Sequence, residues 1–216
     1  MERKLKAELW DKMHYLFRDF NDRMVHVELR YDFEIDIEAL KTVIICFLEK
    51  APVLHSSFRD IKLKSYWKVK DYRIDDVLLV SRPENLEEAV NEFLTGYIPP
   101  ESDLQIRFAV FFHDGGSVLC IVENHMCMDG GDFKYFLKAL CKGYNEYSEK
   151  KISPLGLKNG SRSFEEVYDD FSKTEKKMAE NLYKNVCAKD NHRFPFTENN
   201  IRDRSFIAKR KIEKER

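Results

Sequence analysis

Apolar residues recur along this chain with two different periods, and these periods predict alternating helices and strands. Residues 3–19 place apolar side chains three and four apart, which predicts a helix at the start of the chain. Residues 25–33 alternate between apolar and polar side chains, as in a strand with one buried face. After Asp36, a typical N-cap residue, helical spacing returns until Pro52 ends the run.

The middle of the chain carries the clearest supersecondary pattern, a β-hairpin. Residues 104–112 and 117–123 are rich in strand-forming side chains. Between them, 113–116 reads His-Asp-Gly-Gly and supplies the positive-φ residues that a tight hairpin needs. Before the hairpin we expect strands near 65–71 and 76–81 and a helix opened by Pro83.

After the hairpin, the apolar spacing from Phe133 to Tyr147 predicts a helix, so residues 124–132 are expected to form a strand-to-helix loop. Ser163 and Glu166 have the spacing of a capping box and predict the start of a last long helix. The remainder is polar apart from a strand candidate at 206–208, and its charged end is expected to be solvated. No repeat or low-complexity linker interrupts the chain, so we expect one domain over residues 1–216.

Composition and charge exclude several classes of protein. The 37 basic and 38 acidic residues leave a formal net charge of −1, which argues against a general nucleic-acid binder. The first fifteen residues are charged throughout and no apolar run approaches a bilayer span, so we expect no signal peptide, no membrane span and a cytoplasmic location. The five cysteines never show C-x-x-C spacing, which argues against a disulfide framework or a thiolate zinc site.

The loop at 124–131 combines groups that suit acyl transfer. His125 directly follows the hydrophobic strand, Asp129 comes four residues later, and Gly130 and Gly131 precede the helix. A neutral imidazole can take a proton from an alcohol, amine or thiol that attacks a carbonyl, and return it to the leaving group. The aspartate can orient the loop by an ion pair or by capping the helix, whose free N–H groups favour a developing oxyanion.

Each of these residues also has a purely structural interpretation, because histidine, aspartate and glycine are all common at strand ends and turns. Cys127 could be a thiol nucleophile, but a cysteine two residues from a histidine on an extended loop tends to point elsewhere. His125, Asp129 and Asp132 are too few for a metal site, so no metal is expected. The basic, aromatic stretch 64–73 could meet a phosphate or single-stranded nucleic acid, although an exposed strand face is favoured.

The loop resembles the H-H-x-x-x-D-G motif of an acyltransferase superfamily. That superfamily holds chloramphenicol acetyltransferase, dihydrolipoyl acyltransferases, the condensation domains of nonribosomal peptide synthetases and the alcohol acyltransferases. Residues 27–58 resemble the first strand, crossover helix and H-P-x-L-R-x-x-F segment of condensation domains. Residues 103–149 resemble the block around the motif, with Arg107 at the arginine of its first strand and Tyr144 near the end of its helix.

The resemblance implies a two-layer α+β fold, in which a mixed β-sheet is flanked by helices and forms a chloramphenicol acetyltransferase-like half-domain. It places His125 at the catalytic histidine, Asp129 at the structural aspartate that points toward an arginine, and Gly130 at the motif glycine beside a tunnel. Asn124 stands where the family has the first histidine of the pair, and many alcohol acyltransferases keep only the second.

The arginine partner of the aspartate is not at its usual place. Alignment on Pro52 and Phe58 brings His55 to that position, and Arg59 and Arg107 are further candidates. The chain also resembles only the N-terminal half of the condensation and alcohol acyltransferase enzymes, which are roughly twice as long. Trimeric acetyltransferases have chains of this size, but their motif lies close to the C-terminus.

The resemblance therefore implies an acyltransferase of the condensation type. His125 would act as general base on an alcohol or amine that attacks an acyl thioester, carried by coenzyme A or by phosphopantetheine, with no tightly bound cofactor. A C-terminal half or a second subunit would complete the tunnel, and no nucleic acid is expected as a partner. Two alternatives stay open: a non-catalytic half-domain that binds a carrier protein or another partner, and a homotrimeric small-molecule acetyltransferase.

Overall fold

The computed structural model describes residues 3–20, 23–61, 64–148, 163, 168–169 and 171–187. The described residues up to Ser148 lie in one compact unit and those from Ser163 to Cys187 in another, so each unit is described by itself. In the first unit the elements are, in order, β1 (Lys4–Lys6), α1 (Leu9–Leu16), β2 (Met24–Tyr31), α2 (Ile37–Lys50), the 3-10 helix η1 (Pro52–His55), β3 (Ser56–Arg59), β4 (Tyr66–Val69), α3 (Ile74–Val77), β5 (Leu78–Ser81), α4 (Leu86–Leu94), β6 (Ile106–His113), β7 (Gly116–Asn124) and α5 (Gly130–Ser148). The second unit contains α7 (Lys173–Cys187).

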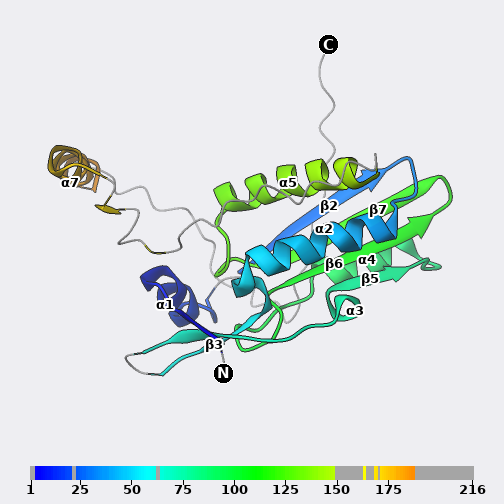
Figure 1. The fold of residues 1–216 in the computed structure, drawn as a ribbon, viewed down its shortest axis with the longest axis horizontal. Helices are drawn as coiled ribbons and strands as arrows, with labels where there is room; N and C mark the ends of the chain where they lie inside the picture. The colour runs from blue at the N-terminus through cyan, green and yellow to red at the C-terminus, as the bar shows by residue number, and fades with distance from the viewer. Residues whose placement is uncertain are drawn as a thin grey trace, which may run out of the picture. The chain divides into compact units, whose positions relative to one another are not determined.

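The centre of the first unit is a mixed four-stranded sheet in the order β2-β7-β6-β5 (Figure 1). β7 is antiparallel to both of its neighbours, whereas β5 is parallel to β6. A second sheet, β1-β4-β3, is antiparallel. The expected mixed sheet flanked by helices is confirmed, and the three-stranded sheet is an addition to it.

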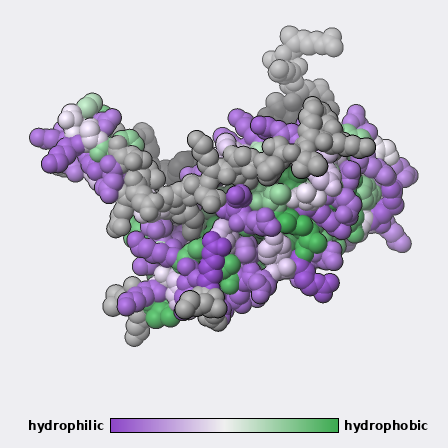
Figure 2. All heavy atoms as spheres, viewed as in Figure 1, coloured by the Kyte–Doolittle hydropathy of each residue, from purple (hydrophilic) through white to green (hydrophobic). Residues whose placement is uncertain are grey.

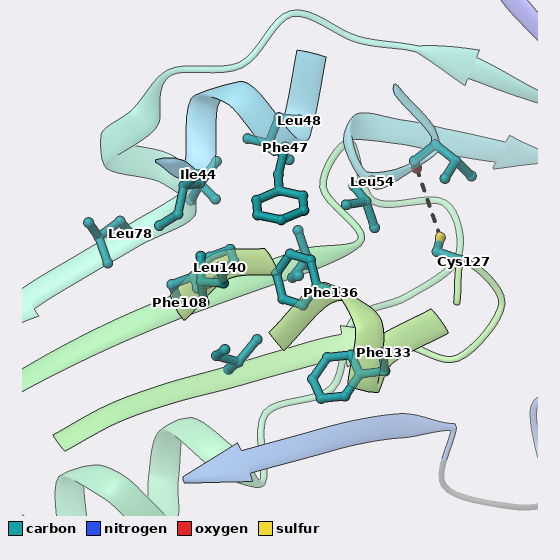
Figure 3. Close-up of a cluster of buried hydrophobic side chains, with 14 of the residues drawn as sticks. Ile44, Phe47, Leu48, Leu54, Leu78, Phe108, Cys127, Phe133, Phe136 and Leu140 are labelled. Atoms are coloured by element: carbon teal, nitrogen blue, oxygen red, sulfur yellow. Dashed lines mark hydrogen bonds between the residues drawn. The ribbon is translucent and has the colours of Figure 1, made fainter. Parts of the chain in front are cut away.

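Helices cover both faces of the four-stranded sheet, because its strands carry apolar side chains on both sides. On one face α2 and α5 enclose the larger core, where Phe47 of α2 packs edge-on against Phe136 of α5 with ring centroids 4.7 Å apart (Figure 3). Phe108 of β6 belongs to the same cluster on the sheet side, and its ring centroid lies 6.2 Å from that of Phe136. Burying each aromatic side chain of this kind contributes roughly 2 to 3 kcal/mol. On the other face α4 packs Val90 and Leu94 against the sheet in a second cluster.

The predicted hairpin is confirmed. β6 and β7 pair in register from Ile106 with Glu123 to His113 with Gly116, so that only two residues form the turn. Gly115 has a φ of 92°, a conformation that costs a glycine little and other residues much. The turn therefore forms where the Asp-Gly pair predicted it.

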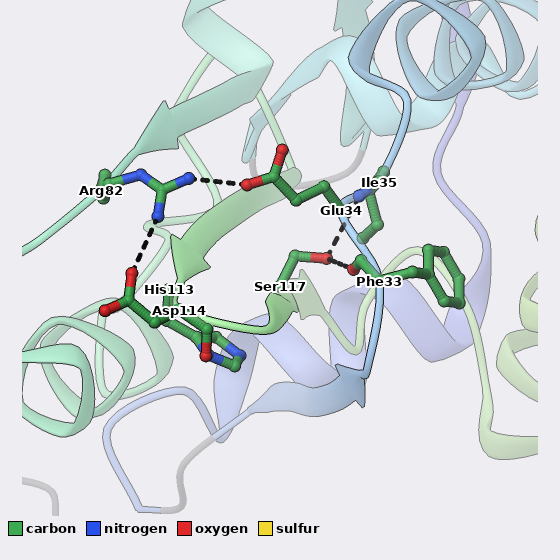
Figure 4. A network of polar contacts seen from close by, with 7 residues as sticks. All are labelled: Phe33, Glu34, Ile35, Arg82, His113, Asp114 and Ser117. Carbon is green, nitrogen blue, oxygen red and sulfur yellow. Dashed lines mark hydrogen bonds and ion pairs between the residues drawn. The ribbon is translucent and has the colours of Figure 1, made fainter.

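The connection from β2 to α2 is hydrogen-bonded to the turn end of this hairpin (Figure 4). The Ser117 hydroxyl donates to the Phe33 carbonyl at 2.8 Å and accepts from the Ile35 backbone N–H at 3.3 Å. Asp36 then caps α2 as predicted, since its carboxylate accepts from two backbone N–H groups of the first turn. Arg82 reaches across to Glu34 at 2.7 Å on the surface.

The N-terminal segment differs from the prediction of a helix over residues 3–19. Lys4–Lys6 forms an edge strand that pairs with Tyr66–Lys68, and the helix spans only Leu9–Leu16. A strand partner that is distant in the sequence outweighs the local helical spacing, because pairing satisfies the backbone groups and buries Trp67. The strand at Ser56–Arg59 was likewise not foreseen.

One helix start differs from the prediction, and the start predicted at Ser163 is not tested. The fourth helix begins at Leu86 with Asn85 as its N-cap, rather than at Pro83. The capping box of α7 is formed by Ser172 and Glu175, whose side chains and backbone N–H groups bond reciprocally at 2.7 to 3.3 Å. The predicted box at Ser163 rests partly on residues outside the described ranges, as does the strand candidate at 206–208.

The surface combines many charged side chains with a group of exposed apolar side chains on α1 and the turn after it. This stripe consists of Leu9, Trp10, Leu16, Phe17 and Phe20. On the face shown in Figure 2 hydrophilic residues predominate, with smaller hydrophobic areas between them. On α1 and the turn after it, however, Leu16 is 65% exposed and Phe20 is 77% exposed. Among the helices in the described ranges, none has the length and apolar composition to cross a bilayer.

Candidate active site

The site begins with Asn124, the last residue of β7, whose buried side chain fixes the turn that follows. Its Nδ2 group donates to the Gln105 side-chain carbonyl at 2.9 Å and to the Ile98 carbonyl at 3.3 Å. Its Oδ1 accepts from the Met126 backbone N–H at 3.1 Å. An amide that both donates and accepts is suited to this position, where it holds the backbone on either side of His125.

His125 follows immediately and continues the sheet by one further hydrogen bond. Its backbone N–H donates to the Arg23 carbonyl at 2.8 Å, just beyond the pairing of Met24 with Asn124. The side chain is half-buried. Within the described part of the chain the Nδ1 atom of His125 is buried and has no hydrogen-bond partner.

A second histidine lies against the first. The ring of His14, from α1, stacks on the ring of His125 with centroids 5.1 Å apart and planes 25° from parallel. The guanidinium of Arg23 donates a short hydrogen bond to His14 Nδ1. Burial lowers the pKa of His14, the charges of Arg23 and His125 lower it further, and the charge of Asp11 acts in the opposite direction.

Sequence analysis missed His14 and Arg23, because neither belongs to a local motif. His14 lies on the first helix, far from His125 in the sequence, and only the folded chain brings the two rings together. A periodicity argument assigns residues to faces of one element and carries no signal for such a contact.

Asp129 lies at the start of α5 and caps it. Its Oδ1 accepts from the backbone N–H groups of Gly131 at 2.7 Å and Asp132 at 2.8 Å. Of the two roles that the sequence left open, the structure shows capping, and Asp129 forms no ion pair within the described residues. Gly130 is the first residue of α5, and a Cβ atom built on it would meet nothing within 4 Å.

The three candidate partners of Asp129 are engaged elsewhere or exposed. His55 Nδ1 donates to the Lys70 carbonyl at 2.6 Å, and its ring packs edge-on against Tyr72. Arg59 is exposed at the end of β3. Arg107 donates to the Tyr97 carbonyl at 3.2 Å, and burial lowers the pKa of its guanidinium.

Arg107 also lies on the other face of the sheet from α5. Its neighbours along β6, Ile106 and Phe108, belong to the core beneath α2 and α5, and side chains alternate between faces along a strand. A Cβ atom built on Gly96, just after α4, would lie 3.1 Å from the Arg107 guanidinium. None of the three candidates contacts Asp129 among the residues that the structure describes.

The remaining chemistry near the loop is structural. The thiol of Cys127 is buried in the core and points toward the Val53 carbonyl at 3.9 Å (Figure 3). The described residues contain no group of three or more His, Cys, Asp or Glu side chains placed to hold a metal ion. An apolar pocket of about 220 Å³, bordered by Tyr31 and Tyr144, lies at the opposite end of β2 and β7 from His125.

The fold is that of the condensation domains and of the related chloramphenicol acetyltransferase-like domains. Solved structures of this class superimpose on most of the chain, although their sequences are very different. No model of a known protein family matches the sequence, and no curated protein matches it either.

Three of these structures illustrate the likeness. A variant of the starter condensation domain of the rhizomide synthetase superimposes with a TM-score of 0.60 at 10% identity, covering 86% of this chain and 48% of that one. The epimerization domain of the third module of tyrocidine synthetase B gives 0.59 at 14% identity, covering 76% and 38%. The X-domain from teicoplanin biosynthesis gives 0.55 at 19% identity, covering 71% and 35%. The chain thus spans less than half the length of each.

Proposed function

We propose that this chain is the histidine-bearing half of a condensation-type acyltransferase. The observation that supports this most directly is the position of His125, directly after the end of a central strand of a condensation-domain fold, with its ring half-buried.

The proposed reaction uses few groups. His125 Nε2 takes the proton of an alcohol or amine while the oxygen or nitrogen attacks the carbonyl carbon of an acyl thioester. The carbon–sulfur bond then breaks, the imidazolium returns its proton to the departing sulfur, and an ester or amide and a free thiol are formed. The donor would be an acyl group on coenzyme A or on the phosphopantetheine of a carrier protein.

The first backbone N–H groups of α5 lie immediately after the histidine loop, but most of them already have acceptors within the chain. The Phe133 N–H, for example, donates to the Asp129 carbonyl at 2.8 Å. Asp129 occupies two of these N–H groups, so its carboxylate keeps the first turn in place rather than serving the substrate.

A second half-domain would complete the channel. The structures with this fold are more than twice as long as the part of them that this chain covers. The helix that carries His14 also exposes the apolar side chains of Leu9, Trp10, Leu16 and Phe17, and a stripe of this kind beside the candidate site suits a protein partner. We therefore propose that a polypeptide equivalent to the second half covers α1.

The test is thioester consumption by the full gene product. With a panel of acyl-coenzyme A and acyl-phosphopantetheine thioesters and simple amine and alcohol acceptors, thiol release is expected to fall about 10²- to 10⁴-fold in His125→Ala. His113→Ala is the matched control, because His113 lies beside the hairpin turn and its ring bonds to the neighbouring Asp114 carbonyl. Equal rates in the two variants, or no thiol release from any thioester, would contradict the proposal.

A further inference from the structure

We propose that His14 is a positioning residue for His125, held in one neutral tautomer by Arg23 so that His125 can take up a proton beside it. The inference rests on the proposed function of His125 as general base. It concerns the first helix and the segment before β2, which the histidine motif does not include.

The position of His14 is fixed by the way α1 is attached to the rest of the unit. Asp11, one turn before His14, is buried, and its Oδ2 accepts from the indole N–H of Trp67 at 2.9 Å. The same oxygen accepts from the Glu8 backbone N–H at 2.9 Å at the start of the helix. Because Trp67 is fully buried, this hydrogen bond sets how α1 lies against the three-stranded sheet, and thereby where His14 lies.

Arg23 contacts both histidines. Its backbone carbonyl accepts from the His125 N–H at 2.8 Å, and its guanidinium donates to His14 Nδ1. A guanidinium has donors only, so the His14 Nδ1 must offer a lone pair, and the proton of the neutral ring resides on Nε2. Arg23 therefore selects the uncharged form of His14 at the same point where it holds the backbone of His125.

This arrangement suits a general base. When His125 takes a proton its ring becomes an imidazolium, and a neutral aromatic ring stacked at 5.1 Å is a favourable neighbour for a cation. A charged His14 would instead repel it. The charged groups that act on His14 are Arg23 from the segment before β2, His125 from the loop after β7 and Asp11 on α1, and the first two oppose its protonation.

The first experiment needs no substrate. The pH titration of the imidazole Cε1–H signals is followed by NMR in the full-length protein and in Arg23→Gln. His14 is expected to titrate below the ordinary histidine value of about 6.5, and its midpoint is expected to rise in Arg23→Gln. An ordinary midpoint for His14, or a midpoint that Arg23→Gln does not raise, would overturn the inference whatever the enzyme does.

The second experiment separates stacking from titration. His14→Phe keeps a flat ring, whereas His14→Ala removes it. We expect His14→Ala to lower kcat for thiol release about tenfold or more with little change in KM, because a misplaced base costs rate rather than binding. His14→Phe should recover most of that loss. In this variant the decrease in rate at acidic pH that results from protonation of His14 should be absent.

Equal kcat in His14→Phe and His14→Ala would overturn the positioning role. A folded but unreactive wild-type protein, or a His125→Ala variant with normal rates, would remove the proposed function instead. The NMR titration would still report whether Arg23 holds His14 neutral, so the two failures are distinguishable.

Discussion

Asp129 caps a helix and forms no ion pair among the described residues. Its oxygen accepts two backbone hydrogen bonds at the start of α5, and the helix N-terminus offers it a partial positive charge. Asp129 lies four residues after His125, so its cap fixes where α5 begins after the histidine loop. The residue therefore orients the site through the backbone.

Substitutions at this position distinguish a cap from an ion pair. Asp129→Ala removes the acceptor and is expected to cost about 0.5 to 2 kcal/mol of unfolding free energy, as measured by urea denaturation. Asp129→Asn keeps a side-chain acceptor but loses the charge, so it should remain close to wild type. A loss in Asp129→Asn as large as that in Asp129→Ala would mean that the charge, and not the cap, is required.

The candidate site could be predicted from the sequence only where its residues are close together in the chain. His125, Asp129 and the hairpin before them form a local pattern, and the structure places them as a strand end, a helix cap and the loop between. His14 and Arg23 reach the site only through the tertiary fold. Nothing in their residue types or sequence neighbours indicates that they lie there. Whether Arg107 faces Asp129 likewise depends on sheet faces that a single sequence does not determine, and His55 is held elsewhere by its hydrogen bond to the Lys70 carbonyl.

The hairpin formed by β6 and β7 could be predicted because its turn residues and its strand pairing favour the same structure. The Asp-Gly turn residues, the alternating apolar positions and the antiparallel register all favour one structure. Gly116 adds a constraint of its own, because a Cβ atom there would lie 2.0 Å from the Tyr31 carbonyl. The close approach of β2 at this end of the sheet therefore requires a glycine.

Gly116→Ala is accordingly expected to destabilise the protein by about 3 kcal/mol, since the β2–β7 pairing must shift to admit the methyl group. Gly130→Ala is the matched control: its Cβ atom would meet nothing, and alanine is the better helix former, so no loss is expected. Thermal unfolding of the two variants provides the comparison, and equal midpoints would contradict the steric account.

The elements that sequence analysis misplaced share one cause. Lys4–Lys6 is a strand because a distant segment pairs with it, although its own spacing is helical. The strand at Ser56–Arg59 likewise forms because the distant segment Tyr66–Val69 pairs with it. Local patterns determine which elements are possible, whereas tertiary pairing selects among them.

The free energy of unfolding of the whole molecule is expected to depend on pH through His14. Its pKa is lowered in the folded state, so above about pH 6.5 it is neutral in both the folded and the unfolded chain. As the pH falls, the unfolded chain takes up this proton first. The contribution of His14 to stability is therefore present at neutral pH and is lost as the pH falls through the lowered pKa.

Urea unfolding of the wild type and of His14→Phe, at about pH 8 and about pH 5.5, measures this contribution. Other groups titrate over the same range, so the quantity of interest is the difference between the two proteins. The wild type is expected to lose more stability on acidification than His14→Phe. An equal loss in both would show that His14 does not carry the proposed linkage.

The stripe on α1 has a consequence for the production of the protein. Side chains such as Leu9, Leu16 and Phe20 are in contact with water even after the rest of the unit has folded. When this segment is produced without a partner, these side chains can associate between copies of the protein, and aggregation is expected to increase with the expression level. Co-production with a covering polypeptide, or serine at these three positions, is the practical route to a well-behaved sample.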